Sequence, residues 1–289
     1  MEISPKPFSI FPRSFLTAAW LGWKIESNWT DPFLFAVYSI IKPLAGAMIL
    51  VVMYGVIANG NYNTPIFAYI YIGNAFYRYV GDVMTGISFT IIEDREHYRT
   101  LRYIYTAPIV VPFYLLGRGV ARFLTSSFAV VVVMGAGILF LHLPFDLQKV
   151  DWLLFLVGLL VGVVMLAMLG LILAGITLLI VNHNYAIGDA VSGALFLFSG
   201  AIFPLDVLPV WLRPIGFIIP VSYWLELLRR ALIGNVAQAF PTFSSLSNLQ
   251  LLGILVTLAI VFGIISVYVF RLCDHNARER GLIDLTTNY

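Results

Sequence analysis

The chain has 289 residues, of which 60% are hydrophobic and only 11% are charged, and its mean hydropathy is +0.92. This composition excludes a soluble globular domain and is typical of a polytopic membrane protein. The single cysteine, Cys273, excludes an intramolecular disulfide framework and a metal cluster built on cysteines. The net charge of +2 says little about partners, and we expect no nucleic-acid partner.

The N-terminal region is less apolar than the rest of the chain. Residues 11–28 interleave Trp20 and Trp23 with a lysine and a glutamate. This mixture favours an amphipathic helix that lies in the interface plane rather than one that crosses the membrane. Met1–Pro12 lacks a basic region followed by an apolar core and a small-residue cleavage site, so we expect no removable signal peptide.

Six later segments are apolar enough to span a membrane, because runs of roughly 20 apolar residues cross about 30 Å of hydrocarbon. We predict an all-α polytopic fold with spans at about 32–58, 66–92, 110–141, 152–181, 187–203 and 249–270. The sequence shows no internal repeat and no low-complexity linker, so we treat 1–289 as a single transmembrane domain.

Lysine and arginine set the orientation, because cytoplasmic segments of membrane proteins are enriched in both. With the N-terminus inside, nine of these residues lie in inner segments and four in outer segments. The inner ones are Lys6, Arg13, Lys24, Arg95, Arg99, Arg102, Arg271, Arg278 and Arg280, and the outer ones are Lys149, Arg213, Arg229 and Arg230. We therefore expect both termini in the cytoplasm and the protein in the plasma or inner membrane.

A dense charge cluster, Glu93–Arg102, separates the second and third predicted spans, and Pro108 ends it. Its alternating charges predict a short exposed helix over 93–106. One interpretation is a solvated loop helix that only fixes topology, and the other is a docking helix for a soluble cytoplasmic partner. The residues expected to dock are Glu93, Asp94, Arg95, Glu96, Arg99, Thr100, Leu101 and Pro108.

A stretch rich in proline follows the fifth predicted span. Proline removes a backbone donor and clashes with the preceding turn, so a helix should stop there, turn back near the membrane surface and resume. Topology puts 204–235 outside, where we predict re-entrant helices that act as an extracellular gate. The expected gate residues are Gly200, Pro204, Pro209, Trp211, Pro220, Tyr223, Glu226 and Arg229. We expect Glu226, Arg229 and Arg230 at or near the outer surface, without a catalytic role.

Charged and polar residues inside the spans are functional hypotheses, since each charge costs about 2.5–3.5 kcal/mol on the insertion scale. They are Lys42, Asn74, Arg78, Asp82, Arg118 and Arg122. Asp82 and Arg118 lie at similar depth, which predicts a structural ion pair between neighbouring helices; gating, contact with an anionic substrate group, and a proton relay are the alternatives. Lys42-Pro43 predicts a kink with the lysine facing protein.

Aromatic residues crowd the second predicted span. They indicate either an interfacial belt or the lining of a pathway that suits sugars or flat amphipathic drugs. The residues proposed for a lining are Tyr69, Phe76 and Tyr77. We expect no metal site, because His142 and His183 lack carboxylate or histidine neighbours at ligand spacing.

The charged segment Glu93-x-x-Glu96-x-x-x-Thr100-Leu101 with Ala107-Pro108-Ile109 resembles the coupling-helix region of the type-2 ABC exporter permeases. The distal pattern is similar to the C-terminal pattern of the same family. It runs Ser199-Gly200, Phe203-Pro204, Leu208-Pro209-x-Trp211, Pro220-x-x-Tyr223-x-x-Glu226-x-x-Arg229 and Gly234. One departure is Arg99, where the family commonly has glycine before the Thr-Leu pair.

The resemblance implies a complex of two permease subunits, as a homodimer, with two nucleotide-binding ATPase subunits, surrounded by membrane lipids. None of the four lysines lies in a Gly-Lys-Ser/Thr context, so this chain should bind no cofactor of its own, and ATP and Mg should sit on the partner. The chain is then not an enzyme by itself.

We expect the permease of an ATP-driven exporter that moves an amphipathic or lipophilic substrate such as a drug, an antibiotic or a lipid. A polysaccharide or glycolipid exporter of the same family is the alternative. A membrane-embedded lipid transferase is a distant one, because metal-binding acidic or histidine clusters are missing from the sequence. An ion-coupled secondary transporter would show broken helices in both halves, and only the C-terminal half is broken.

Overall fold

The computed structural model describes residues 7–28, 31–143, 145–180, 184–234, 241–283 and 285. Helix accounts for 82% of the structure, which confirms the all-α class. Lys6, His183 and the ends of two predicted segments, residues 181 and 235, lie outside the described residues.

Eleven α-helices follow one another in the described part of the chain. They are α1 Pro7–Asn28, α2 Pro32–Ile57, α3 Pro65–Tyr79, α4 Thr85–Ile92, α5 Leu101–Thr106, α6 Val111–Leu141, α7 Trp152–Leu179, α8 Asn184–Phe198, α9 Arg213–Ile218, α10 Pro220–Ile233 and α11 Asn248–Glu279. Two π-helical segments, Val80–Met84 and Glu93–His97, extend α3 into α4 and α4 beyond its end. Short 3₁₀ turns lie at Leu205–Val207 and Pro241–Phe243.

Four helices are long and apolar enough to cross a membrane: Phe33–Ile57, Val111–Leu141, Trp152–Leu179 and Asn248–Glu279. The chain is therefore a multi-pass membrane protein. The second and fifth predicted spans correspond to the α3–α4 helical path and to α8, which has 15 residues. The count of six spans stays a prediction.

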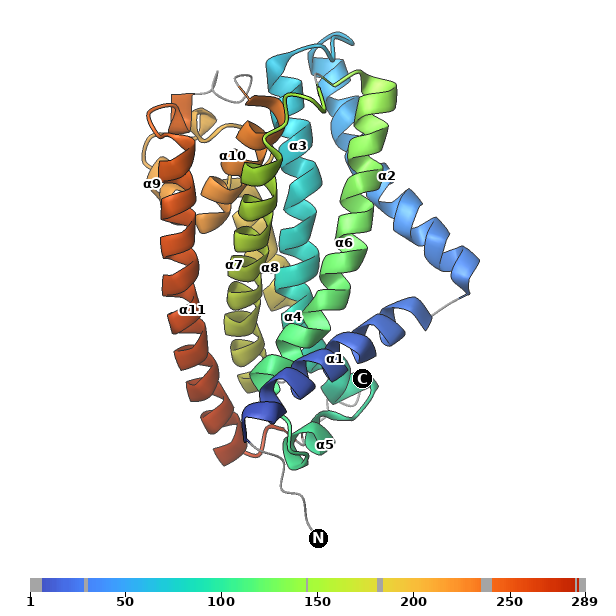
Figure 1. Cartoon of the computed structure of the whole chain (residues 1–289), viewed down its shortest axis with the longest axis vertical. Coiled ribbons are helices and arrows are strands. Elements are labelled where there is room, and N and C mark those ends of the chain that lie inside the picture. The colour runs from blue at the N-terminus through green and yellow to red at the C-terminus, as the bar shows by residue number, and fades with distance from the viewer. Residues whose placement is uncertain are drawn as a thin grey trace.

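The helices form an elongated bundle in which α6, α7, α11 and the α3–α4 path run along the long axis (Figure 1). Helix α1 lies obliquely across α6 and packs closely on it. A Cβ atom at Gly117 of α6 would clash with Ala18 and the Phe15 carbonyl of α1, so this crossing requires a small residue. Helix α5 lies at the same end of the bundle as α1, while α9 and α10 lie toward the opposite end.

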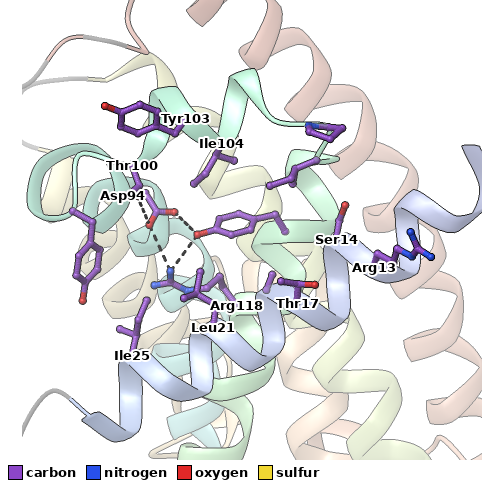
Figure 2. A pocket seen from close by; sticks show the side chains of 15 residues that line it. Arg13, Ser14, Thr17, Leu21, Ile25, Asp94, Thr100, Tyr103, Ile104 and Arg118 are labelled. Atoms are coloured by element: carbon purple, nitrogen blue, oxygen red, sulfur yellow. Dashed lines mark hydrogen bonds and ion pairs between the residues drawn. The ribbon is translucent and has the colours of Figure 1, made fainter. Parts of the chain in front are cut away.

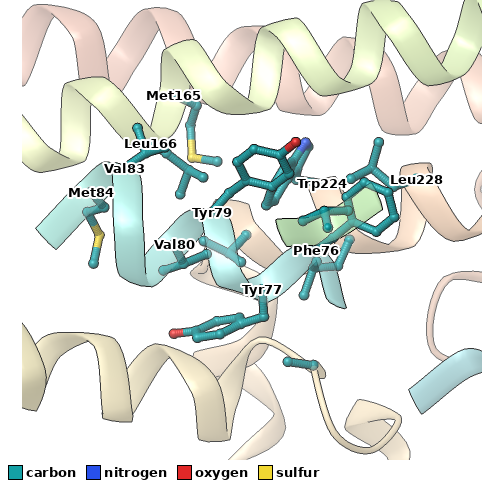
Figure 3. Packing of buried hydrophobic residues seen from close by; sticks show 14 of the residues in the cluster. Phe76, Tyr77, Tyr79, Val80, Val83, Met84, Met165, Leu166, Trp224 and Leu228 are labelled. Atoms are coloured by element: carbon teal, nitrogen blue, oxygen red, sulfur yellow. The ribbon is translucent and has the colours of Figure 1, made fainter. Parts of the chain in front are cut away.

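The α3–α4 path is the centre of the core. Figure 3 shows Val83 beside Met165 and Leu166 of α7, with Trp224 of α10 nearby. This helix is buried on nearly every side because its neighbours are α6, α7, α8 and α10.

The aromatic residues of this path belong to that core. Tyr69, Phe76 and Tyr77 are buried, with 7% or less of each residue exposed. The predicted interfacial belt is therefore wrong, since a belt requires aromatic rings at the lipid surface.

Candidate functional site

The charged segment is not the single exposed helix predicted for 93–106. Glu93–His97 continues α4 as a π-helical turn, a loop follows at Tyr98–Thr100, and α5 begins at Leu101. The amide of Tyr98 bonds the Glu93 carbonyl at 2.8 Å and that of Thr100 bonds the Asp94 carbonyl at 2.8 Å. These two bonds close the α4 helix and turn the chain, so the acidic residues point inward.

Glu93 and Asp94 form an ion-pair network with α6 and α1. The Arg118 guanidinium lies 2.9 Å from the Glu93 carboxylate and 3.5 Å from that of Asp94. Arg122, one turn along α6, lies 2.8 Å from Glu93 and 2.9 Å from Glu26 of α1. Positions four apart share one face of a helix, so both arginines meet the acidic end of α4.

Asp94 lies at the buried end of this network. Its side chain is 2% exposed and accepts a hydrogen bond of 2.9 Å from the Tyr114 hydroxyl (Figure 2). Burial raises the pKa of the Asp94 carboxyl, and the neighbouring Arg118 opposes that shift. Burial also raises the pKa of Glu26, opposed by Arg122.

The predicted pair between Asp82 and Arg118 does not form. The Asp82 carboxylate instead lies 3.0 Å from the guanidinium of Arg78, one helical turn earlier, and accepts a hydrogen bond of 2.7 Å from the Ser126 hydroxyl. Arg118 instead pairs with Glu93 and Asp94, because the turn after α4 places both carboxylates next to α6.

Two further contacts tie the charged segment to other long helices. Arg95 is buried and donates to the carbonyls of Leu178 at 2.9 Å and Ile180 at 3.2 Å, at the end of α7. The Tyr105 hydroxyl of α5 donates a hydrogen bond of 2.6 Å to the Asp274 carboxylate of α11. The segment therefore contacts α6, α7 and α11, and a force applied to it would reach all three.

An exposed surface remains on this segment after those inward contacts. Its exposed members are His97, Tyr98, Arg99, Arg102, Tyr103, Thr106 and Pro108. Arg102 donates a hydrogen bond of 2.8 Å to the Tyr103 hydroxyl, and its guanidinium carbon lies 4.7 Å from the centre of the Tyr103 ring. We call these seven residues the coupling face. Of the predicted docking residues, Arg99 and Pro108 belong to it, Glu93, Glu96 and Thr100 are partly buried, and Asp94, Arg95 and Leu101 are buried.

A second feature is a polar groove along the α3–α4 path, where two adjoining cavities of about 390 and 210 Å³ share Gly81 and Asp82. Its walls come from α2, α3, Val80–Met84, α4 and α8, with single residues of α6. The polar members are Asn74, Arg78, Asp82, Thr85, Ser88, Arg122, Asp189 and Ser192. We call this the lateral groove.

Charge is accessible in the lateral groove, because the side chains of Arg78 and Asp82 are 29% and 34% exposed. Tyr77 and Pro43 also line it, whereas Tyr69 and Phe76 do not. Lys42, expected to face protein, is exposed on α2 next to Pro43, which is buried inside the same helix.

Buried arginines contact the broken segment between α8 and α11 through hydrogen bonds. Arg229 of α10 is 1% exposed and donates to the carbonyls of Tyr69 at 2.9 Å, Gly200 at 2.8 Å and Ala201 at 3.2 Å. Its guanidinium also lies 3.6 Å from the centre of the Tyr69 ring.

Arg230 and Glu226 are buried as well, and they pair with each other at 2.9 Å. Arg230 also donates hydrogen bonds of 2.6 Å to the carbonyls of Leu246 and Phe243. These side chains are therefore enclosed by the protein, and their position at or near the outer surface of the membrane stays a prediction. Helix α10 is enclosed by α3, α7 and α11, so its charged residues find partners inside the chain.

The remaining predicted gate residues surround this buried anchor. Gly200 has φ +73°, the left-handed region that favours glycine, and it ends α8 after Phe198. Pro220 begins α10, and the Tyr223 hydroxyl donates 2.8 Å to the Phe217 carbonyl. Pro204 precedes a 3₁₀ turn, Pro209 is exposed, and Trp211 is 76% exposed.

The sequence profile of the ABC-2 type transporter family matches residues 14–233, which is most of the chain and includes both motif regions except Gly234. The chain belongs to the ABC-2 type transporter family. It is thus a membrane-spanning permease subunit of an ABC transporter and is not catalytic itself. Membership of the family implies association with an ABC ATPase subunit. No curated protein matches this permease significantly.

The residue that departs from the family pattern occupies a distinctive backbone position in this ABC-2 permease. Arg99 has φ +53°, in the left-handed region, at the turn between Glu93–His97 and α5. A glycine adopts this conformation without the steric cost that a Cβ atom brings, about 1–2 kcal/mol. The turn that points Glu93 and Asp94 inward is therefore made here by a strained arginine, which leaves its side chain on the coupling face.

Sequence reasoning missed the partners of several functional residues in the permease. Glu26 and Tyr114 were not singled out, although both contact the ion-pair network. The spacing of Arg118 and Arg122 signalled a charged face on α6, but only the turn after α4 shows which carboxylates meet it.

Proposed function

We propose that this chain is the permease subunit of an ATP-driven exporter in a cell membrane, where it moves an amphipathic or lipophilic substrate. The lateral groove is the observation that supports this most. It places Arg78 and Asp82, both partly exposed, beside apolar lining residues such as Pro43 of α2 and Phe196 of α8. A charge facing lipid costs about 2.5–3.5 kcal/mol, so these two should face water or protein.

A second copy of the permease would supply that protein surface. The groove is flanked by α2 and α8, and facing grooves of two copies would enclose a path with polar walls between apolar helices. The π-helical segment Val80–Met84 lies at the middle of the groove, and such segments are frequent at functional sites. An amphipathic substrate could place its polar part beside Arg78 and Asp82 and its apolar part against the apolar residues of the groove.

Energy would enter at the coupling face. A partner ATPase that docks there would pull on α5, and the contacts of Glu93, Arg95 and Tyr105 would carry the displacement to α6, α7 and α11. With both termini in the cytoplasm the coupling face is cytoplasmic, the broken outer segment lies at the exit, and the transport direction is outward.

A polysaccharide or glycolipid cargo is the second candidate. Asn74, Ser192 and Tyr77 in the lateral groove are side chains that suit sugar hydroxyls. The Tyr77 hydroxyl already donates 2.5 Å to the Ser192 carbonyl, which reduces what the groove offers to a glycan. The amphipathic cargo therefore remains the leading proposal.

Docking is tested by changing the coupling face. The double variant Arg102→Glu, Tyr103→Ala removes an exposed charged and aromatic pair without touching the buried contacts. Co-expressed with a candidate ABC ATPase, it should lose at least about 2 kcal/mol of binding free energy, because aromatic and arginine residues dominate interfaces. Co-purification and ATP hydrolysis by the complex are the measurements.

The matched control is Lys149→Glu, which reverses an exposed charge on the loop between α6 and α7. It should leave the complex and its hydrolysis unchanged. If the coupling-face variant bound the ATPase as tightly as the unchanged permease, docking would have to occur elsewhere.

A further inference from the structure

A cavity of about 770 Å³ lies between α1 and the charged segment (Figure 2). One wall is the inward face of α1, and the other comes from the loop after Glu93–His97, α5 and the start of α6. Its apolar members are Ala18, Leu21, Ile25, Ile104, Pro108 and Ile109. The cavity shares no lining residue with the lateral groove, so it is a separate site.

One end of the cavity is polar but already satisfied. Asp94, Tyr114 and Arg118 meet there and are bonded to one another, and Thr100 lies beside them. A ligand gains little by bringing a charge to this end, since both charges have partners. The body of the occupant should therefore be apolar.

Arg13 gives the cavity a cationic end. It lines the cavity from the first half of α1 and is exposed, and its guanidinium has no hydrogen-bond or ion-pair partner in the part of the chain that the structure describes. In Figure 2 Arg13 lies well apart from the Asp94–Arg118 cluster. A guanidinium matches the geometry of a phosphate group, so this end favours an anionic head.

Large apolar side chains of α1 are exposed on the face away from the cavity. Leu16 and Trp20 are 65% and 61% exposed and lie away from the cavity lining. An amphipathic helix with exposed tryptophan and leucine lies at the boundary between headgroups and acyl chains. A cavity beneath such a helix opens to a region where phospholipids are the most abundant amphiphiles.

We propose that this cavity holds an acyl chain of an anionic phospholipid whose phosphate binds Arg13. The lipid would lie between α1 and the charged segment, in contact with Tyr98 and Tyr103 of the coupling face. If the proposed docking of an ATPase is right, the lipid would then also adjust the coupling between the two subunits. Lipid binding itself does not depend on that docking.

The test measures lipid retained by the purified permease alone, in detergent, after incubation with phosphatidylglycerol or phosphatidylcholine. Thr17→Trp fills the cavity from an exposed position of α1, and its matched control Leu16→Trp adds the same ring one residue earlier, outside the lining. Thr17→Trp should lower retained phosphatidylglycerol roughly tenfold, the factor that two lost buried methylene groups represent. Leu16→Trp should retain it.

Arg13→Gln tests the head of the lipid. This variant should bind both lipids equally, whereas the unchanged permease should prefer phosphatidylglycerol. Excess inorganic phosphate should not displace the lipid, and displacement would mean that a free anion occupies the Arg13 end. Equal retention by the two tryptophan variants, with both folded by size-exclusion chromatography, would overturn the proposal, whether both keep the lipid or both lose it.

Discussion

Replacing Arg229 with alanine is expected to unfold the end of the permease that contains α9 and α10. Three backbone carbonyls, those of Tyr69, Gly200 and Ala201, lose their donor inside a region closed to water. The Tyr69 carbonyl keeps its helical partner within α3, so two carbonyls are left without one. Each such buried group costs about 1–3 kcal/mol, so the total loss should be at least about 2 kcal/mol. Thermal unfolding in detergent measures it, and the yield of folded protein should drop in parallel.

Two companion variants separate this effect from a general loss of charge. Arg229→Lys keeps the charge but not the planar guanidinium with its several donors. Its stability should therefore lie between that of the unchanged permease and that of Arg229→Ala. Arg271→Ala removes an exposed arginine from α11 and should change little. A melting temperature of Arg229→Ala equal to that of Arg271→Ala would show that the buried arginine does not anchor the broken segment.

Replacing Arg118 with methionine is expected to be the second most damaging change. It leaves Asp94 buried beside only hydroxyl partners, while Glu93 keeps Arg122. Removing one member of a buried ion pair costs about 3–5 kcal/mol because the remaining charge is uncompensated. The same unfolding assay measures it. The double variant Arg118→Met, Asp94→Asn should recover most of the loss, and no recovery would contradict the assigned pair.

The stability of the Arg118→Met variant should also depend on pH. Burial already raises the pKa of Asp94, and Arg118 opposes this, so removing Arg118 raises the pKa further. The folded state then holds a proton that the unfolded carboxyl releases near pKa 3.8. Stability should be greatest below that pH and fall as pH rises through the folded pKa, with no such slope in the Asp94→Asn double variant.

Apolar runs predicted the long helices well, because a spanning helix must be apolar along its whole length. The predictions at 32–58, 110–141 and 152–181 each lie within a few residues of α2, α6 and α7. The breaks between α8 and α10 were also predictable, since Gly200 and the prolines stop helices by local geometry that needs no tertiary partner.

Side-chain direction was not predictable where tertiary contacts decide it. Glu93 and Asp94 read as an exposed charged face, but the π-helical turn and the left-handed Arg99 point them toward α6. The burial of Arg229 and Arg230 inside the chain was not predictable for the same reason. Their partners are backbone carbonyls far along the chain, which no residue pattern indicates.

The most direct test of the transport pathway is thiol labelling of the lateral groove. In a Cys273→Ser background, single cysteines replace Asn74 and Ser192 in the groove, or Val164, which is 52% exposed on α7 outside it. A membrane-impermeant thiol reagent is applied to the permease–ATPase complex in membranes, with and without ATP. We predict that the two groove positions label, that ATP changes their rates, and that Val164 stays unlabelled. Groove positions as inert as Val164 in every nucleotide state would contradict a water-accessible path along this face.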